Sequence, residues 1–349
     1  MRKLALFLIV PFLILMAACS SDAGTEKKSK EASEKETTVE EKEAVEQEEE
    51  EPEFENVYPL TGEPTDEEVD HRAISVMVNN HTRARPQSGL SEADVVYEVL
   101  AEGQITRFLA LFHSQIPDTI GPVRSARPYY FELAAGYDAV YVYHGASAAI
   151  NNKVQSSGID FVNGAKYDNN GWLFMRSNER KAPHNSYFLS DGLDRVLEQK
   201  GYDTDMTIEA LPFDEESSGE GQAVNDVKIT YSERPQETVT YTVNSENGTF
   251  LRSSDGRPSN DSNNGERLEP ENVFIVETNH KIIDNVGRRD VDLTSGGTGY
   301  LLQNGKMQEV EWQSENGRIL PYKDGEPLAF TPGQTWVNVI PANATVEAN

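Results

Sequence analysis

The stretch Gly-Pro-Val-Arg-Ser-Ala-Arg-Pro at residues 121–128 constrains the fold more than any other part of this sequence. Each proline fixes φ, removes a backbone N–H donor and restricts the residue before it, so the stretch is neither a regular strand nor a helix. An apolar run precedes it, and the following segment opens with Pro128 and ends at Gly136, as a short helix would. The sequence therefore predicts a strand, a shaped loop carrying Arg124 and Arg127, and a helix start. Guanidinium groups beside a helix N-terminus favour phosphate or carboxylate ligands.

The amino terminus has the pattern of a secretory signal peptide at residues 1–18. Arg2 and Lys3 precede an apolar run, and small residues then precede Cys19, the only cysteine of the chain. The ending Met-Ala-Ala-Cys is similar to a bacterial lipobox, in which Cys19 would receive lipid and become the first mature residue; cleavage without lipidation is the alternative. We therefore expect a protein anchored through lipidated Cys19 at the extracytoplasmic face of the cell membrane, without disulfides or cysteine catalysis.

Residues 19–56 are expected to form a disordered acidic tether behind the lipidated cysteine. Residues 20–56 contain 15 acidic and 5 basic side chains and almost no apolar ones, so they cannot bury enough surface to offset the cost of ordering. The whole chain has a formal net charge of -28. Such acidity argues against a nucleic-acid partner, which requires a basic face.

Two folded domains are expected after the tether. The first, residues 57–210, has alternating strand patterns at 73–79, 95–100, 105–113 and 139–143, interleaved with short helices that Ser147 and Ser190 would cap. This pattern predicts an α+β or α/β domain, a mixed sheet with short helices. Residues 211–224 are rich in acids and glycine and are expected to be a linker.

The second domain, residues 225–345, is expected to be mainly β. Alternating segments at 227–231, 237–243, 272–278, 299–303, 307–312 and 335–340 predict strands. Asn-Gly or Asp-Gly pairs at 247–248, 304–305 and 324–325 predict tight turns between them.

The first domain carries an unusual set of arginines. Residues 73–152 contain five arginines and no lysine, although lysine would serve a merely solvated surface equally well. We expect the loops that bear them to meet over one anionic ligand. The alternative is that the arginines pair with Glu98, Glu102 and Glu132 and brace the loops. The candidate ligand-binding residues are Arg85, Arg107, Arg124, Arg127, His144, Arg180, His184 and Asn185.

Common motifs for catalysis and metal binding are mostly absent from the sequence. The sequence has no nucleophile elbow, P-loop or His-Glu-x-x-His motif, and the six histidines share no metal-ligand spacing, so no metal or cofactor is expected. His144 and His184 could act as a general acid or base, or could be structural. Asp290 and Asp292 could ligate calcium, or could form the polar face of a strand.

Three motifs together carry a resemblance to a known family. They are the segment at 79–90 with Asn-Asn-His and Arg-Pro-Gln-Ser-Gly, the stretch at 121–128, and Ala-Pro-His-Asn at 182–185. With the later motifs at 290–293 and 332–336, this chain resembles the YerB-like family of bacterial lipoproteins over about 57–345. The resemblance implies two paired domains of unknown function on a lipid anchor. Residues 141–145 are also similar to a segment of envelope phosphotransferases that act on polyprenyl-pyrophosphate-linked glycopolymers, whose acidic metal-binding pattern is not evident here.

Three hypotheses of function follow. The first is a lipid-anchored binding or accessory protein of the cell envelope, without catalysis, that binds an anionic cell-wall polymer or a lipid-linked precursor through the arginines. The second is an envelope phosphotransferase acting on a polyprenyl-pyrophosphate-linked substrate. The third is a non-enzymatic scaffold that binds an envelope protein partner of the peptidoglycan synthesis machinery.

Overall fold

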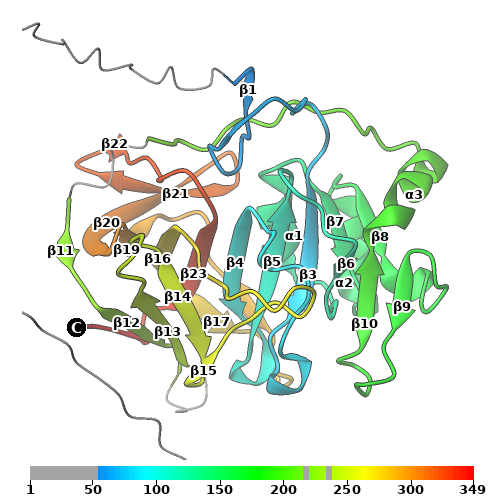
Figure 1. The fold of residues 1–349 in the computed structure, drawn as a ribbon. Coiled ribbons are helices and arrows are strands. Elements are labelled where there is room, and N and C mark those ends of the chain that lie inside the picture. The colour runs from blue at the N-terminus through cyan, green and yellow to red at the C-terminus, as the bar shows by residue number, and fades with distance from the viewer. Residues whose placement is uncertain (1–53, 215–219, 233–237) are drawn as a thin grey trace, which may run out of the picture. The chain divides into compact units, whose positions relative to one another are not determined.

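A computed structural model describes residues 54–214, 220–232 and 238–349 (Figure 1). The expected signal peptide, Cys19 and all of the tether up to residue 53 lie outside the described residues, as do residues 215–219 of the expected linker. Residues 52–349 form one compact unit. No helix among the described residues has the length and apolar character needed to cross a bilayer.

The strands expected in the first domain are present, with ends shifted by one residue at most. They are β3 (Ile74–Asn79), β4 (Val95–Leu100), β5 (Thr106–Phe112) and β7 (Val140–Tyr143), followed by β8 (Phe161–Asn163). A small three-stranded sheet contains β6 (Thr119–Ile120), β9 (Phe174–Arg176) and β10 (Ser186–Leu189), and β1 (Asn56–Val57) pairs with β2 (Pro64–Thr65).

Three short α-helices accompany these strands: α1 (Pro128–Ala135), α2 (Ala148–Ser156) and α3 (Leu193–Lys200). Pro128 opens α1, and the Ser147 hydroxyl accepts the Ile150 N–H at the start of α2, as predicted. The prediction that Ser190 caps α3 was wrong. A 3₁₀ turn at Ser190–Gly192 precedes the helix, and the Ser190 hydroxyl instead donates to the Pro117 carbonyl, 2.9 Å away.

The second half of the chain is mainly β, as predicted. One antiparallel sheet of five strands contains β12 (Asp226–Thr230), β13 (Thr238–Val243), β14 (Phe250–Ser254), β15 (Arg257–Pro258) and β24 (Thr345–Ala348). The remaining strands are β11 (Gln222–Ala223), β16 (Asn272–Thr278), β17 (His280–Ile282), β18 (Arg289–Val291), β19 (Gly297–Gln303), β20 (Lys306–Glu315), β21 (Arg318–Lys323), β22 (Glu326–Pro327) and β23 (Thr335–Pro341).

One 12-stranded sheet contains strands from both halves of the chain. Its order is β22-β21-β20-β19-β16-β23-β4-β5-β3-β7-β8, with β11 paired to β20. The two halves join where β23 pairs in parallel with β4, from Thr335 beside Val95 to Val339 beside Val99. The segment at 211–224 is therefore not a boundary of the sheet.

Two apolar clusters cover the two faces of this sheet. Because successive side chains of a strand point to opposite faces, Leu109 and Leu111 of β5 join the cluster that contains α1 and α2, while Phe108 and Phe112 join the other. The second cluster includes α3, the three-stranded sheet and the five-stranded sheet, which Figure 1 shows lying across β16 and β23.

The strands β3, β4, β7, β16 and β23 all run in one direction, so their carboxyl ends lie along one edge of the sheet. This edge faces downward in Figure 1, where the loops after β3 and β4 are found. Loops at the carboxyl ends of parallel strands commonly form ligand sites. The same edge carries the arginines singled out in the sequence.

Candidate functional site

A pocket of about 320 Å³ opens at this edge, on the face of the sheet that α1 covers. It brings together three of the predicted residues, Arg107 from β5 and Arg124 and Arg127 from the loop before α1. We call it the arginine pocket. Its lining residues are Asn79, His81, Glu102, Ile105, Arg107, Arg124, Arg127, Val286 and Arg288.

The loop before α1 is held in place by backbone hydrogen bonds on both sides. The N–H of Arg124 donates to the carbonyl of Met77 in β3, and its carbonyl accepts from the N–H of His144 after β7. On the other side the N–H of Val123 donates to the carbonyl of Ser186 in β10. The position of Arg124 is therefore set by three different strands, as a preorganised site requires.

Arg107 and Arg127 share a single carboxylate. The Arg107 Nη2 lies 2.8 Å from the Glu102 Oε2, and the Arg127 Nε contacts the Glu102 Oε1. Burial opposes ionisation of Glu102, but the hydrogen bond from Arg127 and the charges of both arginines outweigh it and hold its pKa below the usual value. One negative charge thus faces two guanidinium groups whose side chains are 8% and 12% exposed.

Arg124 has no acidic partner within ion-pair distance among the described residues. Its Nη1 lies 3.5 Å from the Pro183 carbonyl, and its buried Nε has no hydrogen-bond acceptor among those residues. Burial lowers its pKa to about 10, and repulsion from Arg107 and Arg127 adds to this effect. Arg124 therefore stays charged near neutral pH, with donors left for a ligand.

Two histidines stand beside Arg124. The rings of His81 and His184 lie 4.5 Å apart, and the His184 Nδ1 is 2.9 Å from the Asn79 Nδ2. Burial lowers the pKa of both rings, as do the nearby arginines, so both are neutral at pH 7. His184 is buried and was predicted, while His81 lines the pocket and was missed as a candidate.

Arg85 lies apart from the other three arginines. It lines a hollow of about 200 Å³ on the opposite face of the sheet edge, which shares His81 and Ile105 with the arginine pocket. Its Nη1 pairs with the Asp255 Oδ2 at 2.6 Å, and its Nε donates to Asn80. Arg85 is thus internally paired and braces the two halves of the chain.

Arg180 and Asn185 brace loops rather than face the pocket. The Arg180 guanidinium donates to the carbonyls of Ala84 and Pro86 and to the Tyr187 hydroxyl, at 2.7 to 2.9 Å. The Asn185 Oδ1 accepts from Arg176 at 2.8 Å. The loops at 80–87 and 177–186 therefore contact each other, both through Arg180 and through the rings of His81 and His184.

His144 is directed toward another set of residues. Its Nε2 is 3.4 Å from the Asp168 Oδ1, which the Arg176 Nε approaches to 2.7 Å, and its ring packs near Phe174. Burial lowers its pKa although the Asp168 charge acts in the opposite direction. His144 is thus outside the arginine pocket.

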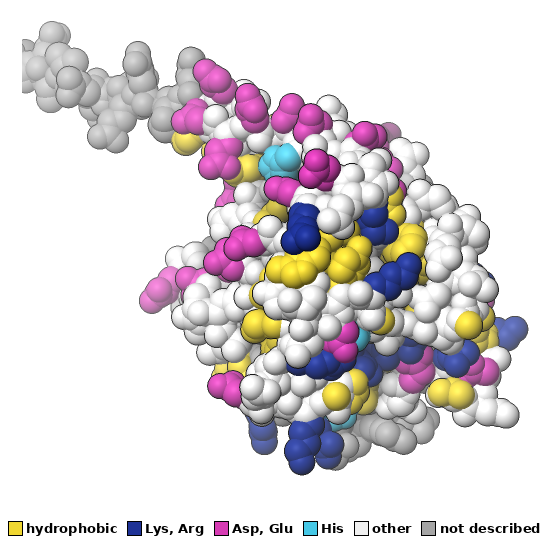
Figure 2. Space-filling view, turned by 90° about the vertical axis from the view of Figure 1, so that its right-hand side faces the viewer, with side chains coloured by type: hydrophobic (Ala, Val, Ile, Leu, Met, Phe, Trp, Pro, Cys, Tyr) yellow, Lys and Arg dark blue, Asp and Glu magenta, His cyan; other side chains and the backbone are white. Residues whose placement is uncertain are grey.

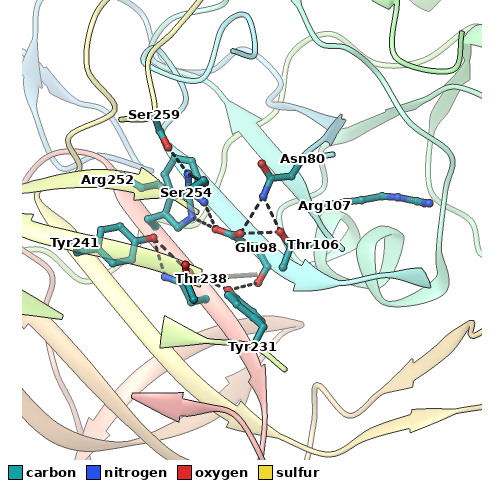
Figure 3. A network of polar contacts seen from close by, with 12 residues as sticks. Asn80, Glu98, Thr106, Arg107, Tyr231, Thr238, Tyr241, Arg252, Ser254 and Ser259 are labelled. Atoms are coloured by element: carbon teal, nitrogen blue, oxygen red, sulfur yellow. Dashed lines mark hydrogen bonds and ion pairs between the residues drawn. The ribbon is translucent and has the colours of Figure 1, made fainter. Parts of the chain in front are cut away.

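The glutamates proposed as internal partners behave differently from one another. Glu102 pairs with two of the arginines, whereas Glu98 lies on the opposite face of the sheet, where it accepts hydrogen bonds from Asn80, Thr106, Arg252 and Trp336. Figure 3 shows Arg107 lying apart from this buried network.

A hairpin from the second half of the chain completes the arginine pocket. Val286 and Arg288 lie in the turn between β17 and β18 and line its mouth. No anion-binding role was predicted for this hairpin, although Arg288 and Arg289 are adjacent in the sequence. The fold brings it close because β17 follows β16, which ends at the same edge of the sheet.

The surface charge is uneven on the end of the molecule that carries β9 and α3. Figure 2 shows dark blue basic side chains gathered across the lower part of this face, with histidines among them and acidic side chains mainly above. The basic region contrasts with the strongly acidic composition of the chain. A local positive field of this kind attracts anions.

The fold and this site define a protein built from two paired sequence domains that share one sheet. The chain belongs to the DUF3048 family: residues 60–203 match its N-terminal domain and residues 227–337 its C-terminal domain, both described as a protein of unknown function. The sequence-based assignment to the YerB-like family is thereby confirmed.

YerB of Bacillus subtilis is similar to this chain in both sequence and structure. "Putative lipoprotein YerB" of Bacillus subtilis (strain 168) is 45% identical over 285 residues, which cover 81% of this chain and 86% of YerB. The crystal structure of YerB from Bacillus subtilis superposes with a TM-score of 0.78 at 44% identity, and covers 84% of this chain and 99% of that one.

Proposed function

We propose that this protein is a lipid-anchored, extracytoplasmic binding or accessory protein of the bacterial cell envelope, and that the arginine pocket holds a phosphate- or carboxylate-bearing ligand. The observation that carries the proposal is the imbalance of charge in the pocket. Arg107, Arg124 and Arg127 face the single carboxylate of Glu102, while Arg288 pairs with its own neighbour Asp284. An anion would complete the pairing and occupy the free donors of Arg124.

The anchoring part of the proposal is supported by two independent observations. The signal pattern of the sequence ends in a segment similar to a lipobox at Cys19, and a relative that is 45% identical carries the name "Putative lipoprotein YerB". The folded part would then be held beside the membrane by the acidic segment that follows Cys19.

The state of the carboxylates favours binding over phosphotransfer. A general acid or base needs a pKa near neutrality and access to the ligand. The pKa of Glu102 is lowered, and both of its oxygens contact arginines. Glu98 is fully buried on the other face of the sheet. Neither is arranged as a proton carrier beside Arg124.

Calorimetric titration of residues 20–349 with inorganic pyrophosphate tests the proposal. These residues keep the whole compact unit. We expect Arg124→Ala to weaken binding by at least tenfold, since a hydrogen-bonded charge pair contributes roughly 1.5 to 3 kcal/mol. Arg195→Ala is the matched control, because Arg195 is exposed on α3, lies over the ring of Trp172 and does not line the arginine pocket. Equal affinity in the Arg124 and Arg195 variants would reject the arginine pocket as the anion site.

A further inference from the structure

The hairpin of β17 and β18 exposes large apolar side chains at its tip. Ile282, Ile283 and Val286 are 59%, 55% and 66% exposed, and among the other large apolar residues that the structure describes only Val57, at 55%, is as exposed as Ile283. Scattered apolar side chains on a surface are normal, but a contiguous group marks a contact site for protein or membrane. These three lie within five consecutive positions of one turn.

The turn that presents these side chains is well ordered by its own hydrogen bonds. The Asp284 Oδ1 accepts the backbone N–H groups of Val286 and Arg288, each at 3.0 Å. The N–H of Ile283 donates to the carbonyl of Arg288 at 2.8 Å, and the Asp284 carboxylate pairs with the Arg288 guanidinium at 3.2 Å. The apolar tip is therefore held outward by a defined turn.

Basic side chains flank the tip. Lys281 precedes the two isoleucines, and Arg288 and Arg289 follow the turn. Asp284 is neutralised by Arg288. Apolar side chains flanked by basic ones suit the interface of a bilayer with anionic headgroups, where the former enter the acyl boundary and the latter stay at the phosphates.

The tip and the anion site adjoin each other. Val286 is one of the exposed apolar residues and also lines the arginine pocket, as does Arg288 beside it. A ligand whose charged group occupies the pocket would thus have its neighbouring atoms beside Val286. The arrangement fits an amphiphile, with phosphate at the arginines and hydrocarbon at the hairpin tip.

We propose that the β17–β18 hairpin inserts its tip into the outer leaflet of the membrane and that the arginine pocket binds the phosphate of a lipid headgroup there. This inference rests on the proposed function and names its ligand class as a phosphate-bearing lipid. The lipid anchor and the hairpin would then form two separate attachments, which together hold the folded unit more firmly than one.

Vesicle flotation with residues 20–349 tests the inference. We expect binding to vesicles that contain phosphatidylglycerol and much weaker binding to pure phosphatidylcholine, because only the former adds negative surface charge. The double variant Ile282→Ser, Ile283→Ser should bind the anionic vesicles at least tenfold more weakly, since burying one such side chain changes a partition constant by roughly tenfold or more. Arg195→Ala should bind as the wild type does.

Inorganic pyrophosphate separates the inference from the function on which it rests. If the double variant, which leaves the pocket residue Val286 in place, still binds pyrophosphate but loses vesicles, while Arg124→Ala loses both, the inference is supported. If the double variant floats with vesicles as the wild type does, the membrane role of the hairpin is overturned and the anion pocket remains. If Arg124→Ala keeps pyrophosphate affinity, the proposed function itself fails.

A fluorescent variant reports the depth of the tip directly. Ile283→Trp replaces one exposed apolar side chain with another, so the fold and the pocket are retained. Vesicles of brominated phosphatidylglycerol should quench the new fluorescence if the tip enters the acyl region. Unquenched emission in bound protein would overturn insertion.

Discussion

Glu98 of β4 and Arg252 of β14 form a fully buried ion pair that joins the two halves of the chain. The Glu98 Oε2 and the Arg252 Nη2 are 2.7 Å apart, and the two side chains are 0% and 1% exposed. Arg252 also stacks over Trp336 and Phe108. One partner belongs to the first family domain and the other to the second, so the pair lies at the centre of their shared core.

Replacing Arg252 with methionine should lower the free energy of unfolding by about 3 to 5 kcal/mol, because Glu98 would remain as an unpaired buried charge. Adding Glu98→Gln should recover part of this loss, since the amide carries no charge and its oxygen can still accept from Asn80 and Thr106. Denaturation in urea, followed by tryptophan fluorescence, measures both effects. A single variant that costs less than 1 kcal/mol would contradict this account of the pair.

Removing Arg124 should leave the fold almost as stable as before. Arg124 has no acidic partner among the described residues and is repelled by Arg107 and Arg127, so Arg124→Ala should change the unfolding free energy by less than about 1 kcal/mol. By contrast, Glu102→Gln leaves two largely buried guanidinium groups without their charge partner and should cost about 2 to 3 kcal/mol. Thermal unfolding of the two variants compares them, and equal losses would contradict the assignment of Arg124 as a ligand residue.

Anion affinity should not depend on the histidines above neutral pH. The pKa values of His81 and His184 are lowered by burial and by neighbouring positive charges, so both rings are mainly neutral above pH 7, while Arg124, with a pKa of about 10, stays mainly charged up to about pH 9. Titration with sulfate, whose charge is constant between pH 7 and 9, should therefore give a nearly constant affinity. A steady loss of affinity as the pH rises from 7 to 8 would instead indicate that a histidinium holds the anion.

Asp94 should make stability depend on pH in an unusual direction. Burial raises its pKa to about 7, although hydrogen bonds from Ser114 and His113 oppose the shift. In the unfolded chain an aspartate loses its proton near pH 3.9. Between about pH 4 and 7 the folded state therefore binds more protons than the unfolded state, and the contribution of this group to stability falls as the pH rises.

The substitution Asp94→Asn isolates that contribution. Its amide oxygen can accept the N–H groups of His113 and Ser114, and its amino group can donate to the Ser114 hydroxyl. The difference in unfolding free energy between the variant and the wild type should shift in favour of the variant from pH 4 to pH 7 and then level off. A difference that does not change with pH would show that Asp94 is ionised throughout.

Local patterns in the sequence predicted most of the strands. Side chains of the segments at 95–100 and 272–278 point alternately to the two buried faces of the sheet. The predicted limits of these segments are those of β4 and β16. The Asn-Gly pair at 304–305 forms the predicted turn because both residues adopt positive φ. The prediction that Ser190 caps α3 was wrong because its hydroxyl donates to the carbonyl of Pro117, a distant partner that no local pattern reveals.

The site could be predicted only in part, for a similar reason. The prolines and arginines at 121–128 indicated a shaped loop with an anion preference. Local sequence could not indicate that Arg85 pairs with Asp255, which is 170 positions away. Nor could it indicate that Val286 and Arg288 approach the arginine pocket from the second half of the chain.

By itself, the sequence determined the secretory pattern with Cys19, the order of strands and short helices, and the loop that bears Arg124 and Arg127, because these depend on residues that are close along the chain. Only the tertiary structure decided that β23 pairs with β4 and that the apolar tip of the β17–β18 hairpin lies beside the arginine pocket. It also decided that Glu102 pairs with two arginines, while Arg124 has no acidic partner among the described residues. Strand pairing and ion pairing between distant segments depend on how the whole sheet packs, and one local pattern is compatible with many such packings.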